Sequence, residues 1–393
     1  ICFFISAWGS MFPESWILTN GKPTLNLLVV FNLYRVLGGI GVGMASAICP
    51  MYIGEVAPSN IRGMLVSWNQ FAIIFGQLVV YFVNFIILGG HSNPIYNAAG
   101  AIANMADAQW TITTGWRYMF GSECIPAALF TIFICFVPET PRYLVMIKQD
   151  KKALDVLTRI NGTEKAIEIL SDIKNTISVK KEKLFSYGFM CIFIGIMLSV
   201  FQQAVGINAV LYYAPRIFQD MGMENPMVQT VIMGIVNISF TLVAVFTVEK
   251  LGRKPLLIWG SIGMAIGALG VAITFGNPSL NILTMVSIMI YSASFMFSWG
   301  PICWVLIAEI FPNTIRGTAV AIAVAFQWIF NFIVSSTFVP MFNMHLSHGD
   351  NFGHWFTYGI YGLICVIAAV FVWKLVPETK GKTLEDMTKL WKK

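Results

Sequence analysis

Apolar runs of about 20 residues recur along the whole chain, and each is long enough to cross the ~30 Å hydrocarbon core of a bilayer as a helix. Only 11% of the residues are charged, against about a quarter in a typical soluble domain, so these runs lack the polar faces that a soluble helix turns to water. We therefore predict an all-α membrane protein with about nine complete spans and the end of another at residues 1–10. The complete spans are 27–49, 64–87, 117–137, 187–217, 227–248, 256–275, 281–308, 317–341 and 354–376.

The basic residues indicate how the chain is oriented. If the charged segment 142–183 lies in the cytoplasm, that side carries 21 of the 25 lysines and arginines. Cytoplasmic loops carry an excess of Lys and Arg. We therefore expect segment 142–183 and the C-terminus to be cytoplasmic and the chain to lie in the cell inner (plasma) membrane. The net charge of +6 then reports topology and not nucleic-acid binding.

Cysteines and histidines do not point to a catalytic centre. All seven cysteines fall within predicted spans, so they predict neither a disulfide nor a metal site. The four histidines fall in predicted outward loops. Three of them (His345, His348 and His354) could hold a metal, but a solvated loop is the favoured interpretation. There is also no nucleophile–histidine pair and no phosphate-binding loop, so we expect no enzyme, no cofactor and no metal.

The sequences on the two sides of segment 142–183 resemble each other. YIGEVAPSNIRG at 52–63 aligns with LIAEIFPNTIRG at 306–317, a shift of 254 residues, and PETPR at 138–142 matches PETKG at 377–381. Two equivalent halves with the solute site near mid-membrane are a known transporter architecture. The same shift predicts that two spans, and part of a third, of a twelve-helix protein precede residue 1. The expected parts are the remainder of an N-terminal six-helix half at 1–141, a cytoplasmic helical linker at 142–183, a C-terminal six-helix half at 184–377 and a cytoplasmic tail at 378–393.

Neutral amide side chains are concentrated within the spans. A polar group in the hydrocarbon region is expensive and tends to face the bundle interior, so each is a candidate site residue. An amide offers two N–H donors and a carbonyl acceptor, which match a hydroxyl that both donates and accepts. No charge lies at mid-span between 187 and 376, which argues against a carboxylate or an amine as the solute. We therefore predict a neutral polyol, most simply a sugar, bound among Gln70, Gln77, Asn84, Gln202, Gln203, Asn208, Asn237, Gln327 and Asn331.

Two helix breaks are expected among these amides. Gly206 should loosen its span, and Gly300 with Pro301 should break the helix just before Trp304. An indole ring can pack against the apolar C–H face of a pyranose, which contributes a few kcal/mol at most. Trp304 and Trp328 are therefore candidate sugar platforms.

The chain resembles the sugar porter family of the major facilitator superfamily, and most closely bacterial D-xylose–proton symporters. The resemblance covers essentially the whole chain and rests on RVLGGIGVGMASAICPMYIGEVAP, NQFAIIFGQL, GWRYMF, PETPRYL, FQQAVGINAVLYYAP, GRKP, SWGPICWVLIAEIFPNTIRG and VPETKGKTLE. It implies a major facilitator fold of two six-helix halves, and proton-coupled transport of a monosaccharide by alternating access, with D-xylose as the expected solute. It also implies sugar contacts at Gln77, Gln202, Gln203, Asn208, Asn237, Trp304 and Gln327, with Tyr212 and Trp328 as further candidates.

Charged residues recur at the expected cytoplasmic span ends of both halves. An exposed ion pair contributes only about 0–1 kcal/mol, but a network that forms in one conformation and breaks in the other can bias a two-state equilibrium. The resemblance implies that these residues lock the outward-facing state, and ordinary anchoring at the membrane surface is the alternative. They are Glu55, Arg62, Glu139, Arg142, Glu249, Arg253, Glu309 and Arg316.

Arg35 differs from these residues because it lies within the 27–49 span. A charge at that depth needs a carboxylate partner, and Glu123 in the 117–137 span is the candidate. In proton-coupled relatives, an Asp in the first span pairs with the arginine that matches Arg35 and carries the proton. The resemblance therefore implies a role in proton coupling for Arg35, and Glu123 is included as its candidate partner.

Two alternatives to symport stay open. A passive sugar uniporter of the same fold would retain Arg35 as well, and a membrane sugar sensor would bind without transport. The expected partners are a monosaccharide, protons and the lipid bilayer, and we expect a monomer.

Overall fold

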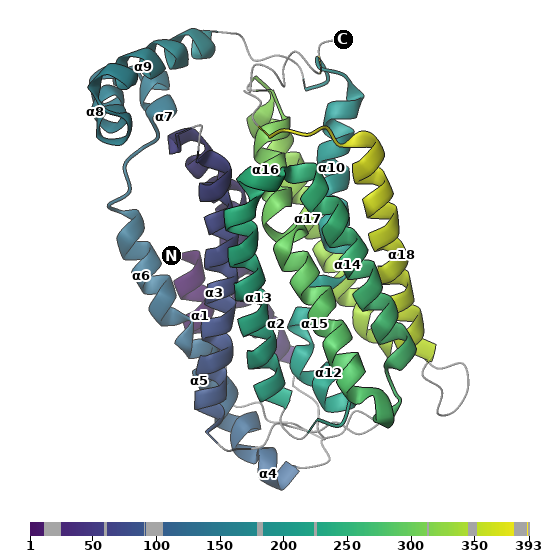
Figure 1. Cartoon of the computed structure of the whole chain (residues 1–393). Helices are drawn as coiled ribbons and strands as arrows, with labels where there is room; N and C mark the ends of the chain where they lie inside the picture. Colours follow the sequence, from purple (N-terminus) through teal and green to yellow (C-terminus); the bar gives the residue numbers. More distant parts are fainter. Residues whose placement is uncertain are drawn as a thin grey trace. The chain divides into compact units, whose positions relative to one another are not determined.

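The computed structural model describes residues 1–11, 25–58, 61–89, 91, 105–178, 184–223, 226–312, 314–344, 352–380 and 391 (Figure 1). These residues form helices and turns, with no strand among them. Two compact units are present, Ile1–Ile48 with Val79–Glu139 and Cys49–Leu78 with Thr140–Lys393. The helices α2 (Leu25–Val56) and α3 (Arg62–Leu88) each contribute to both units. The domain boundaries expected from the repeat stay predictions.

Eight segments of the described chain are helical, long and apolar enough to cross a membrane. They are Leu28–Val56, Met64–Leu88, Phe189–Tyr212, Pro226–Leu251, Arg253–Thr274, Pro278–Ile310, Arg316–Phe342 and Phe352–Leu375. The shorter apolar helix α1 (Cys2–Met11) lies where the end of a further span is predicted. Eight of the nine predicted complete spans are thereby located.

The remaining predicted span, 117–137, is not one continuous helix. It consists of α5 (Trp116–Ser122) and α6 (Cys124–Ile134), with Glu123 in the turn between them. Pro126 explains the interruption, because a proline inside a helix lacks an N–H and its ring clashes with the carbonyl four residues earlier, here that of Ser122.

In the first unit, α1 packs against α5 and α6, and glycines lie where α1 and α2 touch. A Cβ on Gly9 would overlap the ring of Tyr34, and a Cβ on Gly38 would come within 2.5 Å of the Ser6 hydroxyl. Small residues at such contacts let membrane helices approach closely. This unit also contains α4 (Met105–Trp110) and the π-helix Thr111–Gly115, which precede α5.

In the second unit, the predicted break at Gly206 is confirmed. Helix α10 (Phe189–Ala204) ends there and α11 (Ile207–Tyr212) begins, followed by α12 (Ala214–Asp220). Gly206 has φ +84° and ψ 1°, in the left-handed region that glycine adopts without steric cost.

The second predicted break is real but lies earlier than expected. Helix α15 (Asn281–Phe297) gives way to α16 (Trp299–Ile310) at Ser298, two residues before Gly300. The ring of Pro301 would clash with the carbonyl of Phe297, four residues earlier, so the helix breaks directly after that residue. The short 3-10 helix Pro278–Leu280 leads into α15.

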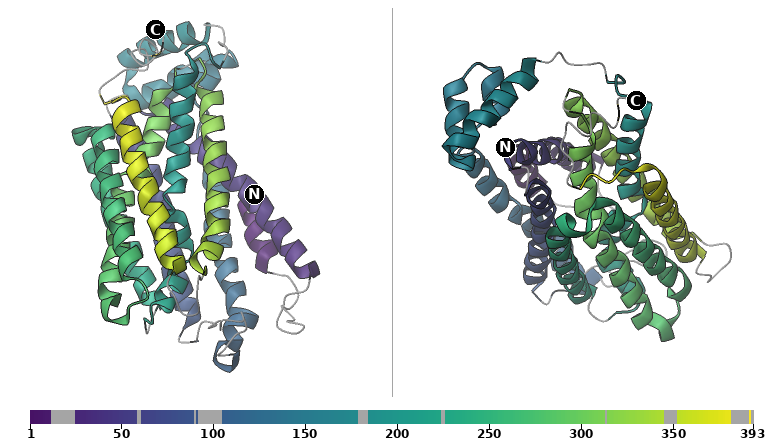
Figure 2. Two further views of the ribbon diagram at one scale, coloured as in Figure 1. Left: turned by 90° about the vertical axis from the view of Figure 1, so that its right-hand side faces the viewer. Right: turned by 45° about the horizontal axis from the view of Figure 1, so that its top comes forward.

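The helices of the second unit pack in pairs, α14 (Arg253–Thr274) against α15 and α18 (Phe352–Leu375), and α10 against α17 (Arg316–Phe342), as Figures 1 and 2 show. Helix α13 (Pro226–Leu251) packs against α15. On α14, four glycines lie so close to α15 or to Ser298, directly after it, that a Cβ on any of them would overlap a neighbouring atom: Gly260, Gly263, Gly267 and Gly270. This stripe of small residues is typical of tight helix pairs in membranes.

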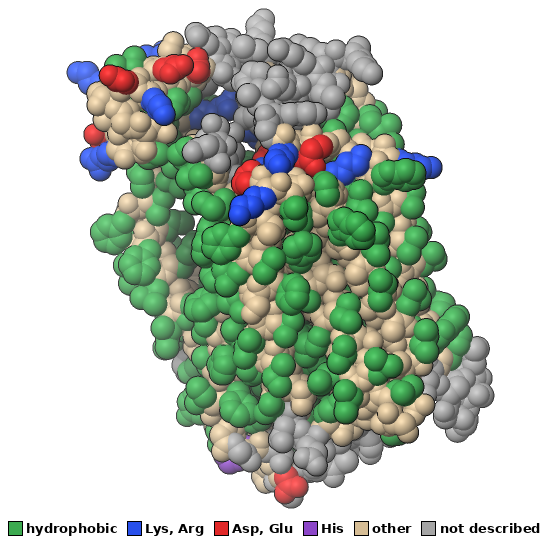
Figure 3. Space-filling view, viewed as in Figure 1, with side chains coloured by type: hydrophobic (Ala, Val, Ile, Leu, Met, Phe, Trp, Pro, Cys, Tyr) green, Lys and Arg blue, Asp and Glu red, His purple; other side chains and the backbone are tan. Residues whose placement is uncertain are grey.

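The face of α14 that points away from the core of the second unit is hydrophobic. Trp259, Ile266 and Ile273, seven residues apart on α14, are 69%, 61% and 74% exposed. Figure 3 shows hydrophobic side chains over this face, with charged side chains gathered at the end where α13 meets α14. Exposed apolar side chains in a continuous band suit a surface that faces lipid.

The region of the predicted linker contains three helices, α7 (Pro141–Met146), α8 (Asp150–Asn161) and α9 (Thr163–Ser178). Thr140 caps α7, its hydroxyl oxygen accepting a hydrogen bond from the Tyr143 amide at 3.2 Å. A small apolar cluster holds the three helices together; it consists of Leu144, Val145, Ala153, Val156, Leu170 and Ile173.

The expectation that all histidines lie in loops is wrong for His354. This residue lies in the first turn of α18, and its ring centroid is 4.2 Å from those of Phe275 and Phe342. Apolar packing at the helix start therefore holds this imidazole. His345 and His348 lie outside the described residues.

Candidate functional site

A network of amide side chains surrounds the break between α10 and α11. Gln202 is at its centre: its Nε2 lies 3.4 Å from the carbonyl oxygens of Trp299 and Gly300, at the start of α16. Its Oε1 accepts hydrogen bonds from Gln203 Nε2, at 3.0 Å, and from Gln327 Nε2 on α17. Two broken helices and α17 therefore meet at one amide.

Gln203 extends the network across the break. Its Oε1 accepts hydrogen bonds from Asn208 Nδ2 at 2.7 Å and from Asn331 Nδ2 at 2.8 Å. Asn331 was a candidate from the amide pattern, although the resemblance did not imply a sugar contact for it. The structure supports it as a candidate because the folded chain brings α17 beside Gln203.

One atom of the network is left without a donor. The side chains of Gln202, Gln203 and Gln327 are 3–5% exposed, and Gln327 Oε1 has no hydrogen-bond partner within the described chain. A buried acceptor without a partner costs about 1–3 kcal/mol. A ligand that supplies a hydroxyl donor at this point would recover that free energy.

The other predicted sugar residues differ in their surroundings. Asn237 is 1% exposed and accepts a hydrogen bond at 2.6 Å from Ser292 on α15, so it is tied to α15. Trp304, on α16, is 7% exposed. Tyr212 lies beside Asn331, and both it and Trp328 are more than a third exposed.

On α3, both Gln70 and Gln77 were candidates from the amide pattern, the resemblance implied only Gln77, and the structure also favours Gln70. Gln70 is 7% exposed, and a Cβ on Gly300 would lie 3.5 Å from its Nε2. It therefore lies near the carbonyl of Gly300 that Gln202 contacts. The seven-residue spacing of the two glutamines placed both on one face of the helix, but could not show that Gln70 lies beside α16. Gln77 is half-buried.

Three of the predicted gating residues form an ion cluster where α13 meets α14. Arg253 is 3% exposed and donates to both oxygens of Glu309, at 3.2 and 2.9 Å, and to both oxygens of Glu249, at 3.0 and 3.2 Å. Such paired contacts from a planar guanidinium are strong and fix geometry. Of the other predicted gating residues, Glu55 and Glu139 are exposed, Arg142 and Arg316 are half-buried, and the side chain of Arg62 lies outside the described part of the structure.

Glu378 also belongs to this cluster, although it was not among the predicted gating residues. Its carboxylate accepts hydrogen bonds from the backbone amides of Arg253, at 3.0 Å, and Lys254, at 2.9 Å, in the first turn of α14. A carboxylate at a helix N-terminus satisfies unpaired N–H groups and matches the helix dipole. The adjacent Thr379 donates to Glu309 at 2.6 Å. The duplicated PET motif was the sequence signal that could have identified Glu378.

In the first unit, the expected proximity of Arg35 and Glu123 is confirmed. Arg35 Nη1 lies 3.4 Å from Glu123 Oε2, and the guanidinium lies 5.0 Å from the ring centroid of Phe120. The turn between α5 and α6 places Glu123 there. Whether the pair takes part in proton coupling stays a prediction.

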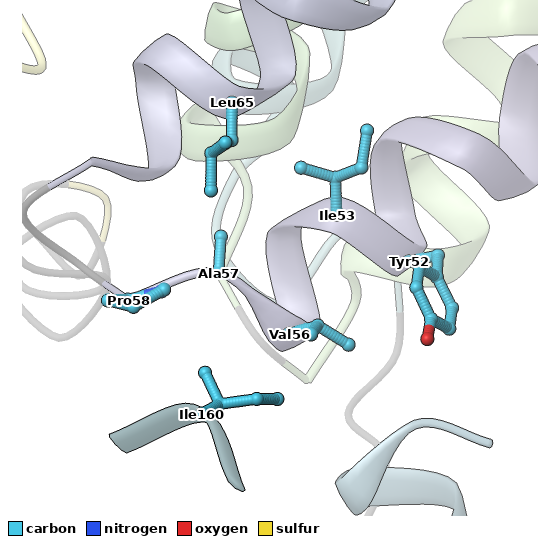
Figure 4. Close-up of a pocket in the computed structure, with 7 residues that line it drawn as sticks. All are labelled: Tyr52, Ile53, Val56, Ala57, Pro58, Leu65 and Ile160. Atoms are coloured by element: carbon cyan, nitrogen blue, oxygen red, sulfur yellow. The ribbon is translucent and has the colours of Figure 1, made fainter. Parts of the chain in front are cut away.

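A separate pocket lies where α2 ends and α3 begins (Figure 4). It is lined by Tyr52, Ile53, Val56, Ala57, Pro58, Leu65 and Ile160, and the Tyr52 hydroxyl is the only polar side-chain group among these seven residues. A polyol needs several donors and acceptors, so this pocket is a poor candidate for the sugar site.

Comparison with known proteins agrees with these features. The family described as "Sugar (and other) transporter" matches residues 1–391. The D-xylose-proton symporter of Escherichia coli (strain K12) is 47% identical over 402 residues, which cover 100% of this chain and 79% of the symporter. The glucose facilitated diffusion protein of Zymomonas mobilis is 34% identical, with 100% and 80% covered.

Solved structures give the same result. A major facilitator superfamily proton:xylose symporter bound to 6-bromo-6-deoxy-D-glucose superposes with a TM-score of 0.83 at 45% identity, covering 100% of this chain and 81% of that one. The fold is therefore the major facilitator fold that the resemblance implied, and the chain belongs to the sugar transporter family.

Proposed function

We propose that this membrane protein carries D-xylose together with protons across the membrane by alternating access. The observation that carries the proposal is the buried amide network around Gln202, which leaves Gln327 Oε1 open to a hydroxyl donor. The similarity to a D-xylose-proton symporter over the whole chain supports it. The chain is a transporter, like the other members of its family, and not an enzyme.

The sugar is held chiefly by amides. Gln202, Gln203, Asn208 and Gln327 supply donors and acceptors, and Asn331 and Gln70 complete the set. A missing or misplaced hydroxyl would leave a buried amide unpaired at about 1–3 kcal/mol, which is how such a site discriminates between sugars. The ring of Trp304 provides an apolar surface for the C–H face of the sugar.

Arg35 and Glu123 take part in proton coupling. Their ion pair lies within a span, where a charge needs a partner. Protonation of Glu123 would neutralise the partner of Arg35 and leave the arginine's charge uncompensated. Binding of a proton would thereby change the net charge of the first unit.

The ion cluster of Arg253, Glu249 and Glu309 serves as a gate at the cytoplasmic ends of the spans. In this proposal segment 142–183 and the C-terminus lie in the cytoplasm, which the distribution of basic residues supports. The protein works as a monomer in the inner (plasma) membrane.

Uptake of labelled D-xylose into proteoliposomes, with and without an inward proton gradient, tests the symport. We expect accumulation above the external concentration only with the gradient, and alkalinisation of the medium when D-xylose is added to cells. Gln203→Ala and Gln327→Ala should both weaken uptake. Unchanged D-xylose affinity in both variants would contradict the proposed sugar site.

A passive uniporter is the second candidate, favoured by the 34% identity to a facilitated diffusion protein. It predicts equilibration of D-xylose without accumulation and without any change of external pH. The same proteoliposomes therefore decide between the two.

A further inference from the structure

The break at Gly206 creates a need for hydrogen bonds. The last carbonyls of a helix have no partner within it, and in the interior of a membrane protein an unpaired polar group is costly. The carbonyl oxygen of Val205, at the end of α10, accepts a hydrogen bond from the hydroxyl of Tyr291 on α15. The Tyr291 side chain, from a neighbouring helix, therefore supplies the hydrogen-bond donor that the Val205 carbonyl needs at the break.

Tyr291 is held firmly in place. Its side chain is fully buried, and its backbone lies against Gly267, where an added Cβ would be 2.6 Å from its amide nitrogen. The next residue, Ser292, donates to Asn237 at 2.6 Å. Close packing with α14 and a polar contact with α13 thus fix this part of α15.

A second tyrosine supports the break by packing. A Cβ on Gly206 would overlap the ring of Tyr361 on α18, whose side chain is 3% exposed. The hydroxyl of Tyr291 thus holds the carbonyl of residue 205, and the ring of Tyr361 leaves no room for a side chain at residue 206.

We propose that Tyr291 is a positioning residue for the sugar site, an inference that rests on the proposed function. Gln203 lies two residues before Val205, and Asn208 lies three residues after it. The hydrogen bond of 2.7 Å from Asn208 to Gln203 crosses the break, so its geometry depends on how the backbone turns there. Tyr291 has no place in the amide network itself; it acts through the backbone that carries two of the amides.

The chain offers a matched control for this role. Tyr358, on α18, is also fully buried, its ring centroid lies 6.4 Å from that of Tyr361, and its hydroxyl has no hydrogen-bond partner among the described residues. Tyr291→Phe removes a hydroxyl that donates to a backbone carbonyl, whereas Tyr358→Phe removes one without a hydrogen-bond partner among the described residues.

The experiment compares the two variants by D-xylose affinity, measured by calorimetry on detergent-purified protein well below the unfolding midpoint. We expect Tyr291→Phe to weaken binding about tenfold, equivalent to about 1.4 kcal/mol, and Tyr358→Phe to stay within about twofold of the unsubstituted protein. In an Asn208→Ala background the effect of Tyr291→Phe should shrink to about twofold, because the two residues act through one contact. A merely structural role would leave the two effects additive.

Hydrogen exchange gives a readout that needs no sugar. We expect the backbone amides of residues 201–210 to exchange faster in Tyr291→Phe and at an unchanged rate in Tyr358→Phe. The inference is overturned if Tyr291→Phe binds D-xylose as tightly as Tyr358→Phe, or if exchange in this segment does not change. Absence of D-xylose binding by the unsubstituted protein would instead contradict the proposed function, and exchange would still decide whether Tyr291 holds the break.

Discussion

Gly206→Ala should be one of the most destabilising single-methyl substitutions in the protein, for two separable reasons. Residue 206 has φ +84°, and the left-handed conformation costs an L-residue about 1–2 kcal/mol. The new Cβ would also overlap the buried ring of Tyr361, and overpacking of this kind costs about 1–3 kcal/mol. Together we expect a loss of about 2–5 kcal/mol in the free energy of unfolding.

Gly222→Ala is the matched control. Gly222 has φ +75°, but no atom lies within 4 Å of the position of an added Cβ. Its substitution should therefore cost only the backbone contribution, about 1–2 kcal/mol. The difference between the two variants isolates the contact with Tyr361.

The assay is reversible unfolding of the purified protein in mixed micelles, followed by circular dichroism. Gly206→Ala should unfold at the lowest denaturant fraction and Gly222→Ala between it and the unsubstituted protein. Equal destabilisation by the two substitutions would refute the packing argument. An undiminished stability of Gly206→Ala would refute the backbone argument as well.

Three further predictions concern the amide network and the two ion pairs. Gln202→Ala removes the acceptor shared by two buried amides, so D-xylose affinity should fall roughly 10–100-fold in equilibrium binding, at about 1–3 kcal/mol per unpaired group. Glu309→Gln leaves the buried guanidinium of Arg253 short of charge compensation and should lower the free energy of unfolding by about 3–5 kcal/mol, measured in mixed micelles. Arg35→Met deprives Glu123 of its cation, so proton-driven accumulation should be lost while exchange of labelled for unlabelled sugar continues.

Each of these predictions has a control. Trp259→Phe on the exposed face of α14 should leave D-xylose affinity unchanged, which separates the Gln202 effect from general damage. Glu249→Gln should be much milder than Glu309→Gln because the Glu249 side chain is 38% exposed and its pair is screened by solvent. Equal effects of the two glutamates would contradict the burial argument. Loss of sugar exchange in Arg35→Met would show that the arginine is needed for sugar movement itself and not for coupling.

Much of the architecture could be predicted because it depends on local properties of the chain. The length of an apolar run is measured against a bilayer of known thickness, so eight of the nine complete spans were located from hydropathy alone. The break at Gly206 was foreseen because glycine adopts the left-handed region without strain. The turn at Glu123 and the position of the second break were missed, although both follow from where a proline ring meets the carbonyl four residues earlier.

The candidate site was predictable in kind but less so in its membership. Intramembrane amides are rare enough to be conspicuous, and hydrogen-bond chemistry pointed from them to a hydroxylated solute. Which amides meet is a different question, since it depends on how α17 and α3 are rotated against the two broken helices. That rotation favours Asn331 and Gln70, which the resemblance did not imply as sugar contacts, and ties Asn237 to α15.

The membrane class, the helical fold and the chemistry of the solute could therefore be predicted from the sequence alone. They depend on hydropathy, on glycine and proline, and on amide content, and each of these acts within a single helix. Three features required helices distant in sequence to be brought together in space: the shared acceptor of Gln202, the carboxylate of Glu378 at the start of α14, and the hydroxyl of Tyr291 on Val205. Hydrogen bonds act over about 3 Å, and no pattern within a single span reports which side chain from another helix will come that close.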